Sequence, residues 1–278
     1  MAGDRRVHQP RKRFGQHFLA DSWADKVVKA IDVEPGDTFL EIGPGTGALT
    51  RPLAATGAPI LAVEIDRVLA GDLARDAPPN VTILSNDFLE ADILPLLSGL
   101  TPQKTAGSSD PMPPARRFRV VGNLPYNIST PLLLRLLELL PQIRDLHFLL
   151  QKEVVDRLSA APRSKDWGRL SVLTQYGATV EPLFDVGPEH FRPPPKVTST
   201  FVRILPKRSP LPLRSRDALV TVLRNAFQQR RKTLRNALQS LSIDWKRVGV
   251  DPGTRADAVD LAGYVDLANL VAEQREHE

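Results

Sequence analysis

The sequence predicts an α/β domain built on a mainly parallel sheet, followed by a small all-helical domain. Short apolar runs rich in β-branched residues recur at 38–42, 60–64, 81–84, 118–122 and 146–151. Helix-compatible segments separate most of these runs, at 22–31, 46–56, 67–75 and 129–140. This alternation is typical of a parallel sheet with helices on its faces. From residue 217 onward the chain keeps helical periodicity and carries no strand signal.

The remaining segments set the expected domain boundaries. Only a Pro-rich stretch separates the runs at 177–185 and 199–205, which predicts an antiparallel pair at the sheet edge. Residues 98–117, rich in Ser, Gly and Pro, predict a mobile surface insertion. Residues 206–216 predict a linker. We therefore expect a first domain over 1–205 and a helical domain over 217–278.

The composition is ordinary for a soluble globular protein, with 42% hydrophobic and 25% charged residues among 278. The chain has no cysteine, which excludes disulfides, thiolate metal sites and cysteine nucleophiles. Its five histidines are scattered without metal-ligand spacing, so we expect no metal. No run is long enough for a membrane span, and the first fifteen residues lack the apolar stretch of a signal peptide. We expect a cytoplasmic, monomeric protein without membrane contact.

Basic residues collect in two clusters. Residues 203–247 hold twelve Lys or Arg and two acids, and the block includes Arg230, Arg231, Lys232 and Arg235. An N-terminal cluster contains Arg11, Lys12 and Arg13. One such block is compatible with a solvated helix face, but two on a protein of pI 9.6 favour a polyanionic partner held through its phosphates. These residues are the predicted contacts to nucleic acid. Arg231 and Arg235 are four residues apart, as are Leu234 and Leu238, which predicts a helix over 228–236 with its cations outward and its leucines on a buried stripe.

The stretch EIGPGTG, residues 41–47, follows the first strand and predicts a cofactor loop that opens a helix. Gly43 and Gly45 let the backbone approach a ligand closely, next to helix N–H groups. A dinucleotide and S-adenosylmethionine are both candidates. The dinucleotide pattern is G-x-G-x-x-G, whereas this loop reads G-x-G-x-G with Glu41 two residues before Gly43. The spacing favours S-adenosylmethionine, which has no pyrophosphate.

Acidic residues end the next two strands. Glu64 lies where a carboxylate accepts from both ribose hydroxyls, and Asp87 is placed to accept from the adenine amino group, with Phe88 beside the ring. Each acid alone is compatible with a solubilising strand end. Because open α/β sheets bind ligands at the carboxyl ends of their strands, we interpret both as cofactor ligands.

The stretch NLPY, residues 123–126, ends the fourth strand at the same edge. At this edge NLPY should face the transferable methyl group of S-adenosylmethionine. An acceptor such as the exocyclic amine of adenine is barely basic, because its lone pair is delocalised into the ring. Two acceptors that hold both N–H groups direct that lone pair at the methyl; we assign the Asn123 side chain and the Leu124 carbonyl. Pro125 restrains Leu124, and Tyr126 offers a stacking face for an extruded base. The alternative is a Pro-containing turn capped by Asn, with Tyr126 in the core.

The sequence resembles the KsgA (RsmA) family of small-subunit rRNA adenine N6,N6-dimethyltransferases. The resemblance rests on RKRFGQHFL (11–19), EIGPGTGALT (41–50), VEID (63–66), NDFL (86–89), GNLPYNIST (122–130), FRPPPKVTST (191–200) and AFQQRRKTLRNAL (226–238). It implies a Rossmann-like class I methyltransferase sheet and cofactor contacts at His17, Leu19, Gly43, Glu64, Asp87 and Asn123. It also implies target-adenine contacts at Asn123, Leu124, Tyr126 and Phe191.

The resemblance further implies dimethylation of two adjacent adenosines in the 3′-terminal hairpin of small-subunit rRNA, within the immature 30S subunit. Two departures stand out: His17 replaces an Asn that is frequent in the family, and the 98–117 insertion is long. Two alternatives stay open. One is a related dimethyltransferase that acts on large-subunit rRNA and confers macrolide resistance. The other is a non-catalytic RNA-binding factor that keeps the fold.

Overall fold

The computed structural model describes residues 15–100, 117–126, 128–208 and 210–276. The contacts divide the chain into two compact units. The first comprises Met1–Lys152 and Glu181–Leu205, and the second comprises Glu153–Val180 and Pro206–Glu278. The expected boundary at 205/206 matches one division point, but the sequence did not predict that 153–180 belongs with the C-terminal helices.

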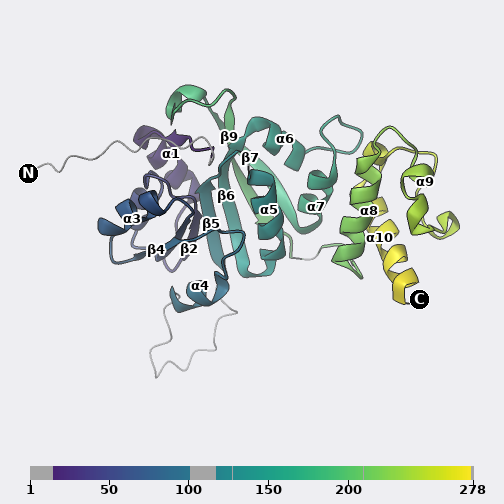
Figure 1. Ribbon diagram of the computed structural model, residues 1–278, viewed down its shortest axis with the longest axis horizontal. Helices are drawn as coiled ribbons and strands as arrows, with labels where there is room; N and C mark the ends of the chain where they lie inside the picture. The colour runs from purple at the N-terminus through teal and green to yellow at the C-terminus, as the bar shows by residue number, and fades with distance from the viewer. Residues whose placement is uncertain (1–14, 101–116, 127, 209, 277–278) are drawn as a thin grey trace, which may run out of the picture. The chain divides into compact units, whose positions relative to one another are not determined.

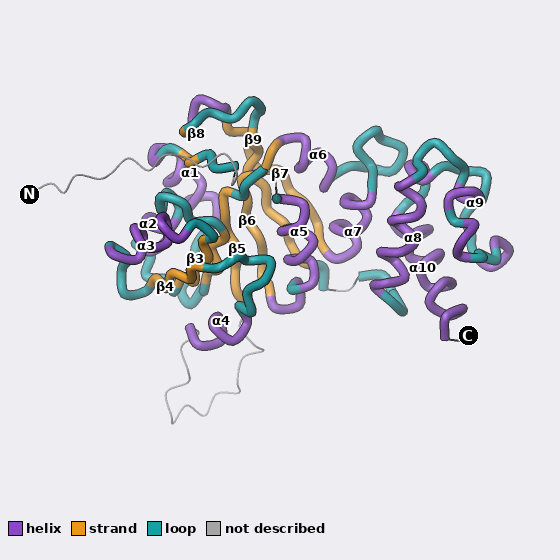
Figure 2. Tube along the Cα trace, viewed as in Figure 1, coloured by secondary structure: helices purple, strands orange, loops and turns teal. Residues whose placement is uncertain are grey.

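The first unit is built on a seven-stranded sheet in the order β4-β3-β2-β5-β6-β9-β7 (Figures 1 and 2). Its strands are β2 (Phe39–Ile42), β3 (Ile60–Glu64), β4 (Val81–Ser85), β5 (Phe118–Asn123), β6 (Ile143–Gln151), β7 (Ala178–Val186) and β9 (Ser199–Pro206). The five strands from β4 to β6 are parallel, and β9 runs antiparallel to β6. The predicted α/β class and the edge position of the last two strands are confirmed.

Helices connect the parallel strands. They are α2 (Thr50–Ala54), α3 (Arg67–Arg75), α4 (Leu94–Leu100) and α5 (Ser129–Glu138), the last followed by the 3-10 turn η2 (Leu140–Gln142). Helix α1 (Asp21–Ile31) precedes β2, and the 3-10 turn η3 (Pro188–His190) follows β7. The side chain of Asp66 accepts from the Val68 N–H and caps α3, which defines where that helix begins. The sequence-based bounds of α3 agree with the structure, whereas α2 is shorter than the predicted 46–56.

Apolar residues on both faces of the central strands form the core, as expected for a sheet covered on both sides. Phe39, Ile60, Val121 and Leu149 are completely buried within one cluster. A small second sheet joins β1 (Phe18–Leu19) to β8 (Phe191–Arg192) in antiparallel register. This pairing fixes the segment before α1 to a segment more than 170 residues later in the chain.

The second unit is helical and contains α6 (Lys152–Leu158), α7 (Arg169–Gly177), α8 (Arg216–Gln228), α9 (Leu234–Ala237) and α10 (Leu261–Glu276). Short 3-10 turns η4 (Gln239–Leu241), η5 (Trp245–Arg247) and η6 (Ala256–Ala258) join the later helices. Trp167 is buried, and its indole N–H donates to the Val259 carbonyl at 2.9 Å. This bond ties the 153–180 segment to the C-terminal helices, which accounts for their common unit.

The basic segment corrects one expectation. A continuous helix through 228–236 would place Arg231 and Arg235 on one face, but α8 ends at Gln228 and α9 begins at Leu234. Thr233 between them is extended and pairs with Arg255 in an isolated bridge. The chain therefore turns at the three consecutive cations, Arg230, Arg231 and Lys232. Leu234 and Leu238 are nevertheless fully buried, as the apolar spacing predicted.

Two predicted segments lie largely outside the described residues: most of the 98–117 insertion, and the N-terminal cluster with Arg11, Lys12 and Arg13. No helix within the described ranges is long and apolar enough to cross a membrane.

Candidate functional site

The glycine loop follows β2 and turns back toward β3. Gly43 and Gly45 have φ of 67° and 58°, in the left-handed region that favours glycine. The Gly43 N–H donates to the Val63 carbonyl at 2.9 Å. The chain then makes turns as far as Leu49, so the loop does not open directly into a helix as predicted. The predicted helix N-terminus is therefore absent directly after Gly47, and turn residues occupy its place.

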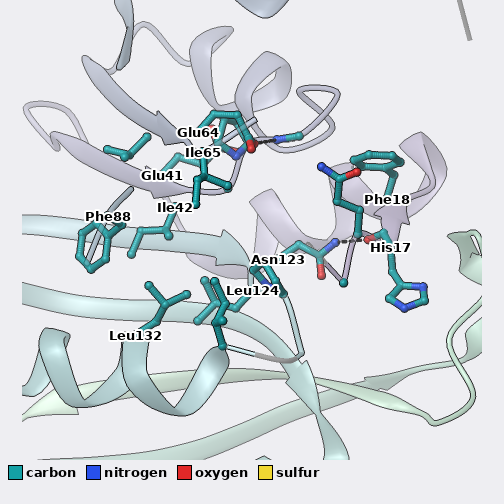
Figure 3. A pocket seen from close by; sticks show the side chains of 18 of the residues that line it. His17, Phe18, Glu41, Ile42, Glu64, Ile65, Phe88, Asn123, Leu124 and Leu132 are labelled. Atoms are coloured by element: carbon teal, nitrogen blue, oxygen red, sulfur yellow. Dashed lines mark hydrogen bonds between the residues drawn. The ribbon is translucent and has the colours of Figure 1, made fainter. Parts of the chain in front are cut away.

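Glu64, the last residue of β3, fastens this loop. Its Oε2 accepts from the Gly45 N–H at 3.0 Å and its Oε1 accepts from the Asp66 N–H at 2.9 Å. Burial raises the pKa of Glu64, and these two donors oppose that increase because they stabilise the carboxylate. The carboxylate lines the same pocket as Gly43 and Gly45 (Figure 3), and each oxygen has further acceptor capacity for a ligand.

Asp87 and Phe88 line the pocket beyond the end of β4. One oxygen of Asp87 accepts from the Leu89 N–H at 2.9 Å, which holds the side chain in place. Phe88 is buried, and with Leu132 and the exposed Ile65 it supplies apolar lining to the same pocket. Ile65 was not predicted from the sequence. Its only signal is its position directly after Glu64.

Asn123 ends β5 on the same pocket. Its amide Nδ2 donates to the His17 carbonyl at 2.6 Å, so the amide orientation is set and its oxygen is turned away from that carbonyl (Figure 3). The preceding Gly122 is required by packing, because a Cβ there would lie 2.6 Å from the Ile42 carbonyl oxygen. Leu124 is buried and also lines the pocket.

Tyr126 completes this side of the pocket. Its hydroxyl shares a hydrogen bond of 2.5 Å with the Ser199 hydroxyl at the start of β9. Burial raises the pKa of Tyr126, which keeps the phenol protonated at neutral pH. The His17 imidazole stacks on the Tyr126 ring with centroids 5.1 Å apart and planes inclined by 24°. Tyr126 therefore lies in the pocket wall and not in the hydrophobic core.

The segment 15–19 lies over the glycine loop. The Phe18 ring lies 3.0 Å from where a Cβ on Gly45 would stand, and Leu19 is buried. The His17 side chain points away from Glu64 (Figure 3), and its Nδ1 bonds to the Pro193 carbonyl at 2.7 Å. The imidazole of His17 is thus directed toward the Pro193 carbonyl and away from the Glu64 carboxylate.

Phe191 is not brought to the pocket. It belongs to β8, is 1% exposed and lies in the hydrophobic cluster of the first unit. The physical reason is the pairing of Leu19 with Phe191 in the β1–β8 ladder, which turns this ring toward the core. The sequence carries no signal for that pairing.

Glu41 is the acid that the sequence interpretation did not assign to a ligand. It lines the pocket and is fully buried, and its Oε2 lacks a hydrogen-bond partner among the described residues. Burial raises the pKa of Glu41 to about 7, with a smaller contribution from the nearby Glu64 carboxylate. A buried carboxyl with one unpaired oxygen beside an open pocket is a candidate ligand for a cationic group.

The pocket fits S-adenosylmethionine better than a dinucleotide. None of the described residues that line it is Lys or Arg, so it offers no side-chain cation for a pyrophosphate. Its carboxylates suit ribose hydroxyls and an ammonium group, and its apolar wall suits an adenine. Within the described ranges, no cluster of three His, Asp or Glu could hold a metal ion.

The predicted cations of the second unit lie apart from these residues in the sequence. Arg231, Lys232 and Arg235 are exposed. Arg230 is also exposed, but its guanidinium donates to the carbonyls of Lys165 and Trp167, each at 3.1 Å. Part of its donor capacity is therefore used within the unit.

Comparison with known proteins gives consistent matches. A family model described as ribosomal RNA adenine dimethylase matches residues 7–273. Proteins named ribosomal RNA small subunit methyltransferase A from Pseudomonas syringae pv. syringae and Pseudomonas aeruginosa are each 46% identical, with 96% of this chain and 96% of theirs covered.

Two solved structures resemble the fold. A dimethyladenosine transferase from Plasmodium falciparum has a TM-score of 0.68 at 23% identity, covering 90% of this chain and 96% of that one. The 23S rRNA methyltransferase ErmE has a TM-score of 0.62 at 25% identity, covering 91% and 99%.

Proposed function

The chain belongs to the ribosomal RNA adenine dimethylase family, and on that premise we propose how its residues carry out S-adenosylmethionine-dependent dimethylation of small-subunit rRNA adenines. The observation that carries the proposal is one pocket where the glycine loop, two strand-end carboxylates and the Asn123 amide meet. The glycine loop and the two carboxylates suit the cofactor, and the Asn123 amide suits the amine that receives the methyl group.

We propose that Glu64 accepts from the ribose hydroxyls while Gly43 and Gly45 allow close backbone approach. Asp87 accepts from the adenine amino group of the cofactor, and Phe88 packs against its ring. Leu19 closes the pocket from the N-terminal segment, and His17 contributes through its backbone. Support comes from the shared lining of the pocket and from the bond that ties the Gly45 N–H to Glu64.

Bound S-adenosylmethionine supplies a methyl group on a positively charged sulfur. The protein's task is to orient the target amine. We propose that the Asn123 oxygen and the Leu124 carbonyl accept the two N6–H groups, so that the nitrogen lone pair points at the methyl. As the N–C bond forms and the C–S bond breaks, the excess amine proton passes to solvent. Because Asn123 donates to the His17 carbonyl, its oxygen is fixed before the substrate arrives.

Tyr126 serves as the stacking face for a target base taken out of its helix. Arg231, Lys232 and Arg235 of the second unit, together with Arg230 and the N-terminal Arg11, Lys12 and Arg13, hold RNA phosphates. Their exposure, where described, and the pI of 9.6 support this assignment.

We propose two adjacent adenosines of the 3′-terminal hairpin as targets, modified within an immature 30S subunit in the cytoplasm. We propose that a single copy of the chain acts on the RNA. The relatives' printed name, which specifies the small subunit, supports this choice over the large subunit.

The test is incubation with labelled S-adenosylmethionine and either immature small subunits or naked large-subunit rRNA, followed by nucleoside analysis. We expect dimethyladenosine in the small-subunit RNA alone. Label in the large-subunit RNA would instead favour the resistance-type activity. RNA binding without transfer to either substrate would indicate a non-catalytic factor.

A further inference from the structure

Three distant segments of the first unit converge on the Tyr126 ring. Tyr126 follows β5, His17 precedes β1, and Ser199 begins β9. The Ser199 side chain is fully buried, and its hydroxyl bonds to the phenol at 2.5 Å. The His17 imidazole stacks on the ring at 5.1 Å. The phenol oxygen and a ring face are thus held from two directions.

Each of the two residues that hold Tyr126 is itself anchored. Ser199 is the first residue of β9 and pairs with Gln151 in the last pair of the β6–β9 ladder, so its backbone is held by the sheet. The imidazole of His17 is fixed by the Pro193 carbonyl at 2.7 Å. The backbone of His17 is fixed by the Asn123 amide at 2.6 Å. Because both contacts of the Tyr126 ring are anchored, the ring has little freedom to rotate.

We infer that Ser199 and His17 are positioning residues for Tyr126, and that the His17 side chain serves the target adenosine and not the cofactor. This inference rests on the proposed stacking role of Tyr126. A base that must be unstacked from RNA gains from a ring already fixed in place, because the ring then loses no rotational freedom on binding. The orientation of the imidazole away from Glu64 agrees with this assignment (Figure 3).

The hydroxyl pair allows a double-mutant test. Tyr126→Phe, Ser199→Ala and the double variant all lose the same hydrogen bond. We expect each single variant to lower single-turnover methyl transfer to the small-subunit precursor about tenfold, the effect of one lost hydrogen bond. The double variant should also lose about tenfold and not about a hundredfold, because the bond is removed only once. Calorimetric affinity for S-adenosylmethionine should stay within about twofold throughout.

Two further variants separate positioning from general stability. Ser199→Thr keeps the hydroxyl and should retain most of the transfer rate. His17→Ala should weaken transfer while leaving S-adenosylmethionine affinity unchanged. Additive losses in the double variant would overturn the Ser199 assignment, and a tenfold loss of cofactor affinity in His17→Ala would overturn the His17 assignment.

A second readout does not depend on activity. The chain has three tyrosines, so ring-labelled tyrosine gives a simple NMR spectrum. We expect His17→Ala and Ser199→Ala to shift the Tyr126 ring signals and to speed its ring flips, while Tyr176 and Tyr264 stay unchanged. Unchanged Tyr126 signals would refute the positioning role. If the unsubstituted protein transfers no methyl group, the proposed function fails, and this spectrum still decides whether the two residues hold the ring.

Discussion

At the scale of one residue, the buried carboxyl of Glu41 lowers the free energy of unfolding at neutral and alkaline pH. A carboxyl whose pKa is about 7 in the folded protein and 4.5 when unfolded resists ionisation on folding. Below pH 4.5 both states are protonated and no difference arises. Between pH 4.5 and 7 Glu41 ionises in the unfolded state but not in the folded state, so the folded state is progressively disfavoured, by roughly 3 kcal/mol at most above pH 7.

We therefore expect Glu41→Gln to raise the free energy of unfolding at pH 8 and to leave it nearly unchanged at pH 4.5. Urea titration of the cofactor-free protein at the two pH values measures the difference. An equal effect at both pH values would contradict the burial of an ionisable Glu41.

Glu64 carries the second prediction at this scale. Replacing it with Ala removes the acceptor proposed for two ribose hydroxyls, so S-adenosylmethionine binding should weaken by about 2 kcal/mol, or roughly thirtyfold. Glu64→Gln keeps one acceptor oxygen and should give an intermediate loss. Calorimetry measures both. Unchanged affinity in the Ala variant would remove Glu64 from the site.

At the scale of elements, the basic segment between α8 and α9 provides the sharpest test of RNA binding. Replacing Arg231, Lys232 and Arg235 with Gln should leave stability and cofactor affinity nearly unchanged, because all three are exposed. If they meet phosphates, binding to the small-subunit precursor weakens and its log–log salt dependence becomes shallower by about two to three units.

The matched control replaces Arg224, Lys246 and Arg275, which are also exposed cations of the second unit. It changes the net charge equally. A similar change of slope in the control would show that overall charge causes the effect. An unchanged slope in the test variant would show that Arg231, Lys232 and Arg235 are solvated and do not contact RNA phosphates.

The same segment shows where sequence reasoning succeeds and where it ends. Burial of Leu234 and Leu238 follows from apolar spacing, which is a local signal. The break between α8 and α9 depends on Thr233 pairing with Arg255, a contact made by tertiary structure. The strands and the pocket residues that end them were likewise predictable. The β1–β8 pairing was not, because two-residue strands carry no periodicity.

At the scale of the whole molecule, the chain comprises two compact units. The first holds the whole candidate pocket, and the second holds the exposed cations of the 230–235 segment. The helical pattern of 153–180 fits either unit, and the packing of α7 against α8 and α10 places it in the second. Substitutions in the 230–235 segment should therefore change RNA binding and leave cofactor binding unchanged.

The central claim is that the Asn123 oxygen, oriented by the His17 carbonyl, positions the target amine. Single-turnover methyl transfer by Asn123→Ala tests it most directly, with Asn123→Asp as a control that keeps an acceptor but loses the amide donor. We predict that the Ala variant binds S-adenosylmethionine and folds normally but transfers methyl groups about a hundredfold to a thousandfold more slowly. The Asp variant should fall between. Near-normal transfer by the folded Ala variant would contradict the account.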